Sequence, residues 1–418
     1  MFRNLVANSL AALLTCSALP ALAQSGETVE EVDPFIAAIG ENVLEIELDE
    51  AGELAGPGWD VLRERAEEAQ FFLIGETHAT ADIALVSAAI HRALAPKGYE
   101  HLVVEIGPWS TRFTEQLVRS GETTLADYIA TPGKQFTLPF LNWTEEIALI
   151  NQAIALSPHE SHVLWGVDQE FVAGGPVLAP LLTQFAQTDT QVAAAEAFAK
   201  GSATNFAYLG AAPQEEIDAL VAAFADGPQE ARALVDAIAL SHRVYGPFVR
   251  GSGPIYPANL ERENYMKRNF LTHFSEAEAR LGYPPKALFK FGGFHLERGL
   301  SGTNVPSFGN FVMEWGRARD FGTVHVMIDC VSGEAWAIQR NAPQPCSPYN
   351  LPEDSPILAA LEGRDSGLID LTALRPLLRA NTPVDARTRD LILSYDYYLG
   401  LRDTKAGTPA ADLTFPPQ

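Results

Sequence analysis

The sequence predicts an α/β fold with a central, largely parallel sheet flanked by helices. Five mostly apolar runs recur along the chain, and runs of this length are typical of strands that are covered on both faces. Between the first two runs, residues 81–94 place apolar side chains at helical spacing. This alternation of strand and helix indicates a parallel sheet. The runs are Phe71–Ile74, His101–Val104, Val163–Trp165, Ala287–Phe291 and Val324–Ile328.

The composition limits the kinds of partner that this protein can have. Of 418 residues, 53 are acidic and 29 are Lys or Arg, which gives a formal charge of −24. A surface this negative repels phosphate backbones, so we expect no nucleic-acid partner. No internal apolar stretch is long enough to form a membrane span in the mature protein. These observations exclude classes of partner; the substrate that we expect is a small molecule or a peptide.

The first 23 residues have the layout of a secretory signal peptide. Arg3 precedes an apolar stretch from Leu5 to Leu19, and small residues at 21–23 predict a cut after Ala23. The mature protein is therefore predicted to be periplasmic or secreted.

The later cysteines fit an oxidising compartment. We expect a disulfide between Cys330 and Cys346, with two free buried thiols as the alternative.

The rest of the chain divides into three parts. Residues 24–65 form an acidic N-terminal extension, residues 66–345 an α/β domain of catalytic type, and residues 346–418 a C-terminal extension that packs on the core. About 120 residues separate the third and fourth apolar runs, which is too long for one crossover. We therefore predict a helical insertion at about 190–250 in this Ala-rich stretch.

Polar side chains follow four of the five apolar runs. Because the carboxyl ends of parallel strands meet at one edge of a sheet, and ligands bind at that edge, we expect these side chains to form one site. The alternative for any single one of them is a helix cap or a surface position. The residues are Glu76, His78, Glu105, Asp168, Glu170 and His295.

This expected site combines imidazoles with carboxylates. A neutral imidazole beside a carboxylate suits a general base that takes a proton from water, and we assign that role to His78. If a metal is bound, Glu76, His78, Glu105 and His295 have the ligand types for Zn²⁺ or Mn²⁺. Several buried carboxylates also need positive charge nearby, from a metal, a protonated histidine or Arg262.

Other enzyme classes lack their motifs in this chain. There is no Gly-x-Ser-x-Gly elbow, no His-Glu-x-x-His helix, no Gly-x-x-x-x-Gly-Lys phosphate loop and no Gly-x-Gly-x-x-Gly after a strand. The usual serine hydrolases, zincins and nucleotide-binding folds are therefore disfavoured.

The ordered set of motifs resembles the erythromycin-esterase-like, ChaN and Tiki superfamily over roughly residues 66–340. Two departures are visible: only one residue separates Glu76 from His78, where the esterases have two, and Gly292-Gly293-Phe294-His295 lacks one histidine of their pattern. The matching segments are Gly75-Glu76-Thr77-His78, Val104-Glu105, Gly166-Val167-Asp168, the strand end at His295, and the helix from Arg262 and Glu263 to Asn269.

The resemblance implies an exported hydrolase in which water activated by His78 attacks an ester, lactone or amide carbonyl. Arg262 would balance charge or stabilise the oxyanion, and Asp168, Glu170 and Glu263 would belong to the polar cluster. Members of the superfamily differ in chemistry, since Tiki proteins are metal-dependent proteases and ChaN binds haem. The alternative is therefore a haem- or metal-binding protein without catalysis, in which His78, His295 or Tyr side chains would serve as ligands.

Overall fold

The computed structural model describes residues 33–349 and 351–414, and the predicted signal peptide lies outside them. Its centre is an eight-stranded sheet. From β12 to β6 all neighbouring strands are parallel, while β1 and β11 pair antiparallel at one side, so the predicted α/β class is confirmed. In spatial order the strands are β1 (Val43–Leu44), β11 (Ser366–Asp370), β12 (Tyr397–Leu401), β8 (Thr323–Cys330), β4 (Phe71–Glu76), β7 (Ala287–Gly292), β5 (His101–Val104) and β6 (Leu164–Gly166).

Each predicted apolar run overlaps one of these strands, but three strands were not predicted. Strands β11 and β12 come from the C-terminal extension and β1 from the N-terminal extension, so both ends of the described chain add to the central sheet. Two small sheets lie outside it. They are formed by β2 (Glu47–Leu48) with β3 (Leu54–Ala55), and by β9 (Glu334–Ala337) with β10 (Ala342–Pro345).

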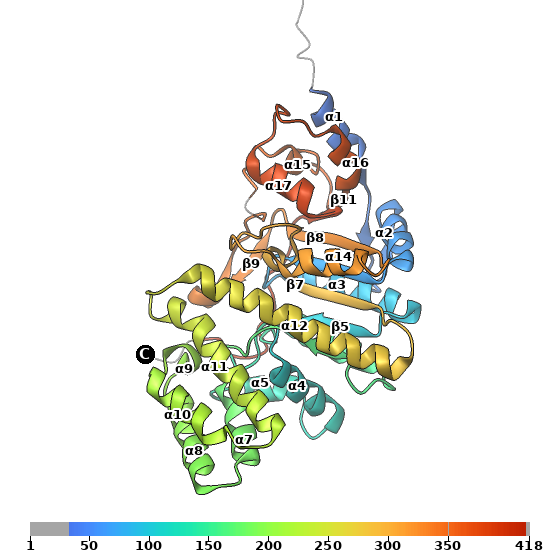
Figure 1. Cartoon of the computed structure of the whole chain (residues 1–418). Helices are drawn as coiled ribbons and strands as arrows, with labels where there is room; N and C mark the ends of the chain where they lie inside the picture. Colours follow the sequence, from blue (N-terminus) through green and yellow to red (C-terminus); the bar gives the residue numbers. More distant parts are fainter. Residues whose placement is uncertain (1–32, 350, 415–418) are drawn as a thin grey trace, which may run out of the picture.

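Helices cover both faces of the sheet, and the strand β4 shows why its sequence is apolar throughout. Phe72 and Ile74 pack with one set of helices, whereas Phe71 and Leu73 pack with the other, because successive side chains of a strand point to opposite faces. In Figure 1 the second set crosses in front of the sheet. The first set includes α2 (Pro57–Glu68), α3 (Ala81–Leu94) and α6 (Thr144–Leu156), and the second includes α12 (Ile255–Leu281) and α14 (Phe308–Arg317).

The stretch predicted as a helical insertion is helical, and α11 packs against α12. Figure 1 shows α7 to α11 gathered at one end of the molecule. Within the described residues, no helix combines the length and the apolar character needed to cross a bilayer. The helices gathered at this end of the molecule are α7 (Gly175–Phe185), α8 (Asp189–Thr204), α9 (Tyr208–Ala211), α10 (Gln214–Phe224) and α11 (Gln229–Val249).

The remaining helices lie between these elements and at the end of the molecule opposite to α7–α11, where α1 packs with α15 and α16 (Figure 1). They are α1 (Pro34–Glu41), α4 (Pro108–Ser120), α5 (Leu125–Ala130), α13 (Gly293–Leu296), α15 (Pro356–Ala359), α16 (Leu371–Leu374) and α17 (Ala386–Ser394), with short 3₁₀ turns at Ala95–Lys97, Ile338–Arg340 and Arg375–Leu377.

The last described segment returns to the loop that follows β4. Ala79 has a φ of 66°, which is uncommon for a residue with a side chain. Its carbonyl accepts hydrogen bonds of 2.9 Å from the backbone N–H groups of Gly407 and Trp336. Thr80 also forms a β-bridge with Ala406. Residues 404–410 therefore support the chain immediately after His78.

A disulfide joins the end of β8 to the following strand pair. It links Cys330 to Cys346, with the two Cα atoms 6.2 Å apart.

Candidate active site

Four of the predicted residues meet at the carboxyl edge of the sheet. The register explains their meeting, because Glu76 at the end of β4 lies beside Gly292 at the end of β7, and the next parallel strand, β5, ends one residue before Glu105. A cavity of about 290 Å³ opens there. Its wall includes Glu76, His78, Glu105 and His295, together with the rings of Phe294 and Tyr349.

The first histidine is held by a buried carboxylate. His78 Nδ1 lies 2.9 Å from Glu76 Oε1, and the side chain of Glu76 is 4% exposed while that of His78 is 36% exposed. The ring of Phe140 stacks on the imidazole with centroids 4.4 Å apart. Burial lowers the pKa of His78, but Glu76 and Glu105 outweigh this effect and raise the pKa above its ordinary value.

A second histidine–carboxylate pair faces the first. His295 lies in α13, directly after β7, and its Nδ1 is 2.6 Å from Oε1 of Glu263 on α12. Both side chains are buried. Burial and the charge of Arg262 lower the pKa of His295, but Glu263 and Glu105 together raise it.

Glu105 lies between the two pairs. Its Oε2 is 3.7 Å from His78 Nε2, and its Oε1 is 3.4 Å from His295 Nε2. The backbone N–H of Gly292 donates to Oε2 at 2.7 Å. Burial raises the pKa of Glu105, but positive charge on His295, His78 and Arg262 more than offsets burial and lowers the pKa to about 2. The Glu105 side chain is therefore ionised.

Arg262 supplies the positive charge that the sequence required, but from outside the cavity. Its Nη2 lies 2.8 Å from Glu105 Oε1 and 2.6 Å from Asp168 Oδ2, and its Nε donates to Asp168 Oδ1 at 3.0 Å. Neither Arg262 nor Asp168 is part of the cavity wall. Their geometry supports charge balance and the positioning of Glu105.

Glu170 was predicted in the same cluster, and the structure places it elsewhere. Its carboxylate accepts hydrogen bonds from the Trp109 backbone N–H at 2.8 Å and from Ser110 Oγ at 2.6 Å, at the first turn of α4. Unpaired N–H groups at a helix start attract a carboxylate, and this accounts for its direction. Burial raises the pKa of Glu170 to about 7. Glu170 caps a helix and does not line the cavity.

The sequence analysis missed a buried lysine behind Glu76. Lys290 on β7 has its Nζ 2.6 Å from Glu76 Oε2 and 2.6 Å from Oε1 of Glu146 on α6. The signal was present, because Lys290 is the one charged residue in the apolar run from Ala287 to Phe291. A lysine within a covered strand requires a buried partner.

The four candidate metal ligands do not fit a metal centre in this arrangement. The oxygens of Glu76 are bound to His78 and Lys290, and those of Glu105 to Arg262 and the N–H of Gly292. Among the described residues, these four side chains do not bring three ligand atoms within 4.8 Å of one another. A haem on His78 would also lie against these carboxylates, which disfavours that ligand.

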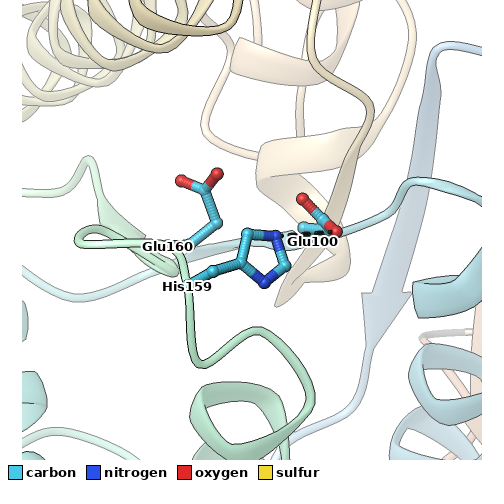
Figure 2. Close-up of side chains that lie close together, drawn as sticks. All are labelled: Glu100, His159 and Glu160. Atoms are coloured by element: carbon cyan, nitrogen blue, oxygen red, sulfur yellow. Dashed lines mark ion pairs between the residues drawn. The ribbon is translucent and has the colours of Figure 1, made fainter.

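A different group of side chains has metal-like spacing. Among residues 33–349 and 351–414, Glu100, His159 and Glu160 bring one ligand atom each within 4.8 Å of one another (Figure 2). Glu100 precedes β5, so this group lies at the amino edge of the sheet, opposite to the cavity. Both oxygens of Glu160 face the guanidinium of Arg280, at 2.9 and 2.5 Å, so its charge is already neutralised. We assign these contacts a structural role.

Comparisons with known proteins identify the fold. No protein-family model and no curated protein matches the sequence. Three solved structures are similar to the chain, at TM-scores of 0.56 to 0.59.

The first is a protein from Bacillus cereus, with 14% identity over 90% of this chain and 98% of its own, at a TM-score of 0.59. The second is a succinoglycan biosynthesis protein, with 14% identity over 92% of this chain and 100% of its own, at a TM-score of 0.58. The third is an erythromycin esterase carrying a His-to-Asn substitution, in its open conformation, with 12% identity over 84% of this chain and 94% of its own, at a TM-score of 0.56. The chain therefore has an erythromycin-esterase-like fold. The ChaN and Tiki part of the resemblance stays a prediction.

Proposed function

We propose that this protein is a hydrolase that uses water, activated by His78, to attack an ester, lactone or amide carbonyl. The observation that carries the proposal is the pairing of His78 Nδ1 with Glu76, which leaves Nε2 directed toward Glu105 at the cavity wall. The likeness to an erythromycin esterase supports a hydrolase of this kind.

The geometry suggests a role for each group. His78 Nε2 takes a proton from water while the water oxygen bonds to the carbonyl carbon. The resulting imidazolium is stabilised by Glu76 on one nitrogen and by the ionised Glu105 near the other. His295, whose pKa is raised, then donates a proton to the leaving group as its bond to the carbonyl carbon breaks. The products are a carboxylic acid and an alcohol or amine, and the enzyme returns to its starting state when His78 releases its proton to solvent and His295 takes one up.

The same proposal includes export. The signal-peptide pattern of residues 1–23 supports it, and so does the disulfide between Cys330 and Cys346, because such bonds persist in oxidising compartments. Mass spectrometry of protein from the periplasm or medium is expected to find a chain that begins at Gln24. An intact N-terminus in the cytosol would contradict export.

A panel of aryl esters, lactones and peptides tests the hydrolase proposal. His78→Ala and Glu105→Gln are expected to lose at least about a hundredfold in kcat, the smallest contribution usual for a general base. His159→Ala is the matched control, because that side chain is 63% exposed at the opposite edge of the sheet. Full activity in folded His78→Ala would refute the proposal. A wild type without turnover that binds haem, with a Soret band, would support the binding-protein alternative.

A further inference from the structure

The feature that the proposed mechanism does not use is the ammonium group beneath the first histidine pair. Lys290 lies on the central strand β7, and its side chain is 5% exposed. It shares a sheet face with Leu288, which belongs to the apolar core between the sheet and α6. Burying an ammonium group at such a position is costly unless it is fully paired. Its partners therefore indicate what it does.

Four side chains form a continuous series of polar contacts from this core to the cavity. Glu146 Oε1 lies 2.6 Å from Lys290 Nζ, Nζ lies 2.6 Å from Glu76 Oε2, and Glu76 Oε1 lies 2.9 Å from His78 Nδ1. Each oxygen of Glu76 thus has one fixed partner. Only His78, at the end of the series, has a substantially exposed side chain.

We propose that Lys290 is a positioning residue for His78, acting through Glu76 and anchored by Glu146. With Lys290 on one oxygen, Glu76 stays ionised and its other oxygen accepts the N–H of His78 Nδ1. That hydrogen bond fixes the tautomer whose unprotonated nitrogen is Nε2, on the side of the cavity. The inference rests on the proposed function, because it concerns how the proposed general base is prepared.

The charge of the cluster agrees with this role. Burial raises the pKa of Glu146, and Lys290 offsets this effect only in part. The imidazole of His78 has carboxylates on both sides, Glu76 at Nδ1 and Glu105 near Nε2, which favour its protonated form. Burial lowers the pKa of Lys290, but Glu146 and Glu76 raise it well above its ordinary value, so the ammonium persists. Burial raises the pKa of Glu76, but Lys290 and His78 outweigh burial and keep it lowered.

The variants Lys290→Met and Lys290→Arg test the inference. In Lys290→Met, Glu76 loses the partner that keeps it ionised, so kcat should fall roughly tenfold or more while KM stays within about twofold. Lys290→Arg keeps the charge and should retain most of kcat. Lys97→Met is the matched control, because Lys97 forms an exposed pair with Glu67. If Lys290→Met does not fold, the double variant with Lys290→Met and Glu146→Gln takes its place in the test. In that variant Glu76 is the only carboxylate that has lost its ammonium partner.

Nitrogen NMR of the imidazoles gives a readout that needs no substrate. The His78 signals, assigned by their loss in His78→Asn, should show one tautomer with Nδ1 protonated in the wild type and in Lys290→Arg. They should show a mixture or the other tautomer in Lys290→Met. An unchanged tautomer with an unchanged kcat in a folded Lys290→Met variant would overturn the inference. If instead His78→Ala keeps full activity, the hydrolase proposal fails, while the tautomer still decides the role of Lys290.

Discussion

Arg262 and Asp168 form a two-point ion pair, with Nε–Oδ1 and Nη2–Oδ2 distances of 3.0 and 2.6 Å, between residues 94 positions apart in the chain. The pair connects α12 to the end of β6, and the same guanidinium reaches Glu105. One arginine therefore contacts two buried carboxylates that follow different strands.

Removal of this guanidinium is expected to destabilise the protein. Arg262→Ala leaves Asp168 and Glu105 buried without their cation, and the loss in free energy of unfolding should be about 3 kcal/mol. The free energy of unfolding of Arg262→Lys should lie between those of the wild type and Arg262→Ala, because an ammonium keeps the charge but cannot reproduce the forked contacts of the guanidinium. Urea unfolding measures the change. Arg63→Ala is the control, since its pair with Asp60 is exposed and contributes about 0.5 kcal/mol or less. Equal losses for both alanine variants would contradict this account.

Glu105 should make stability depend on pH in the acid range. Its pKa is about 2 in the folded protein, against an ordinary 4.5, so the folded state holds its carboxylate ionised. The stability that this provides, on the order of 3 kcal/mol, is present above pH 4.5 and is lost as the pH falls toward 2.

The advantage of the wild type over Glu105→Gln in urea unfolding should therefore be full near pH 6 and shrink below pH 4.5. Using the difference between the two proteins cancels the other titrating groups. A difference that does not change with pH would show that Glu105 is not held ionised by its neighbours.

Gly292 should be needed for the position of His78. A Cβ atom at residue 292 would lie 2.6 Å from His78 Nε2 and 3.3 Å from Glu105 Oε2. Gly292→Ala should therefore displace the imidazole and reduce kcat by tenfold or more, by roughly 1.4 kcal/mol in activation free energy. The backbone at this position has a negative φ, which alanine accepts.

The matched substitution is Gly40→Ala in α1, where a Cβ would meet nothing within 4 Å. It should leave kcat unchanged. The prediction is contradicted if Gly292→Ala hydrolyses the same substrate at the wild-type rate.

The disulfide should support one wall of the cavity. Ser347 and Tyr349 line the cavity, and they follow Cys346 directly in the chain. Replacing both Cys330 and Cys346 by Ala should lower the free energy of unfolding by up to about 3 kcal/mol and raise KM, with a smaller effect on kcat. Urea unfolding and steady-state kinetics measure both effects. Wild-type values of both would show that the wall is held by other contacts.

The sequence predicted much of the site because the polarity of parallel strands is a geometric constraint. Once Phe71–Ile74, His101–Val104 and Ala287–Phe291 are read as neighbours in one parallel sheet, Glu76, Glu105 and His295 must meet at the same edge. Helix 81–94 was predicted by its apolar spacing and matches α3.

Other features depend on contacts that a periodic pattern does not contain. The direction of Glu170 is decided by free N–H groups at the start of α4, and the role of Lys290 by a carboxylate on α6. Strand β12 lies in the predicted C-terminal extension and was not predicted as a strand, because its place beside β8 is a long-range pairing.

The support that residues 404–410 give to the loop after His78 has a consequence for the order of synthesis. Lys405 donates its backbone N–H to Asp82, 323 residues earlier in the chain. A ribosome that has translated β8 has already made Glu76, His78, Glu105, Glu263 and His295, but not the segment that fixes Ala79 and Thr80. The imidazole of His78 thus acquires this backbone support only after the strands of the sheet's parallel core have been made.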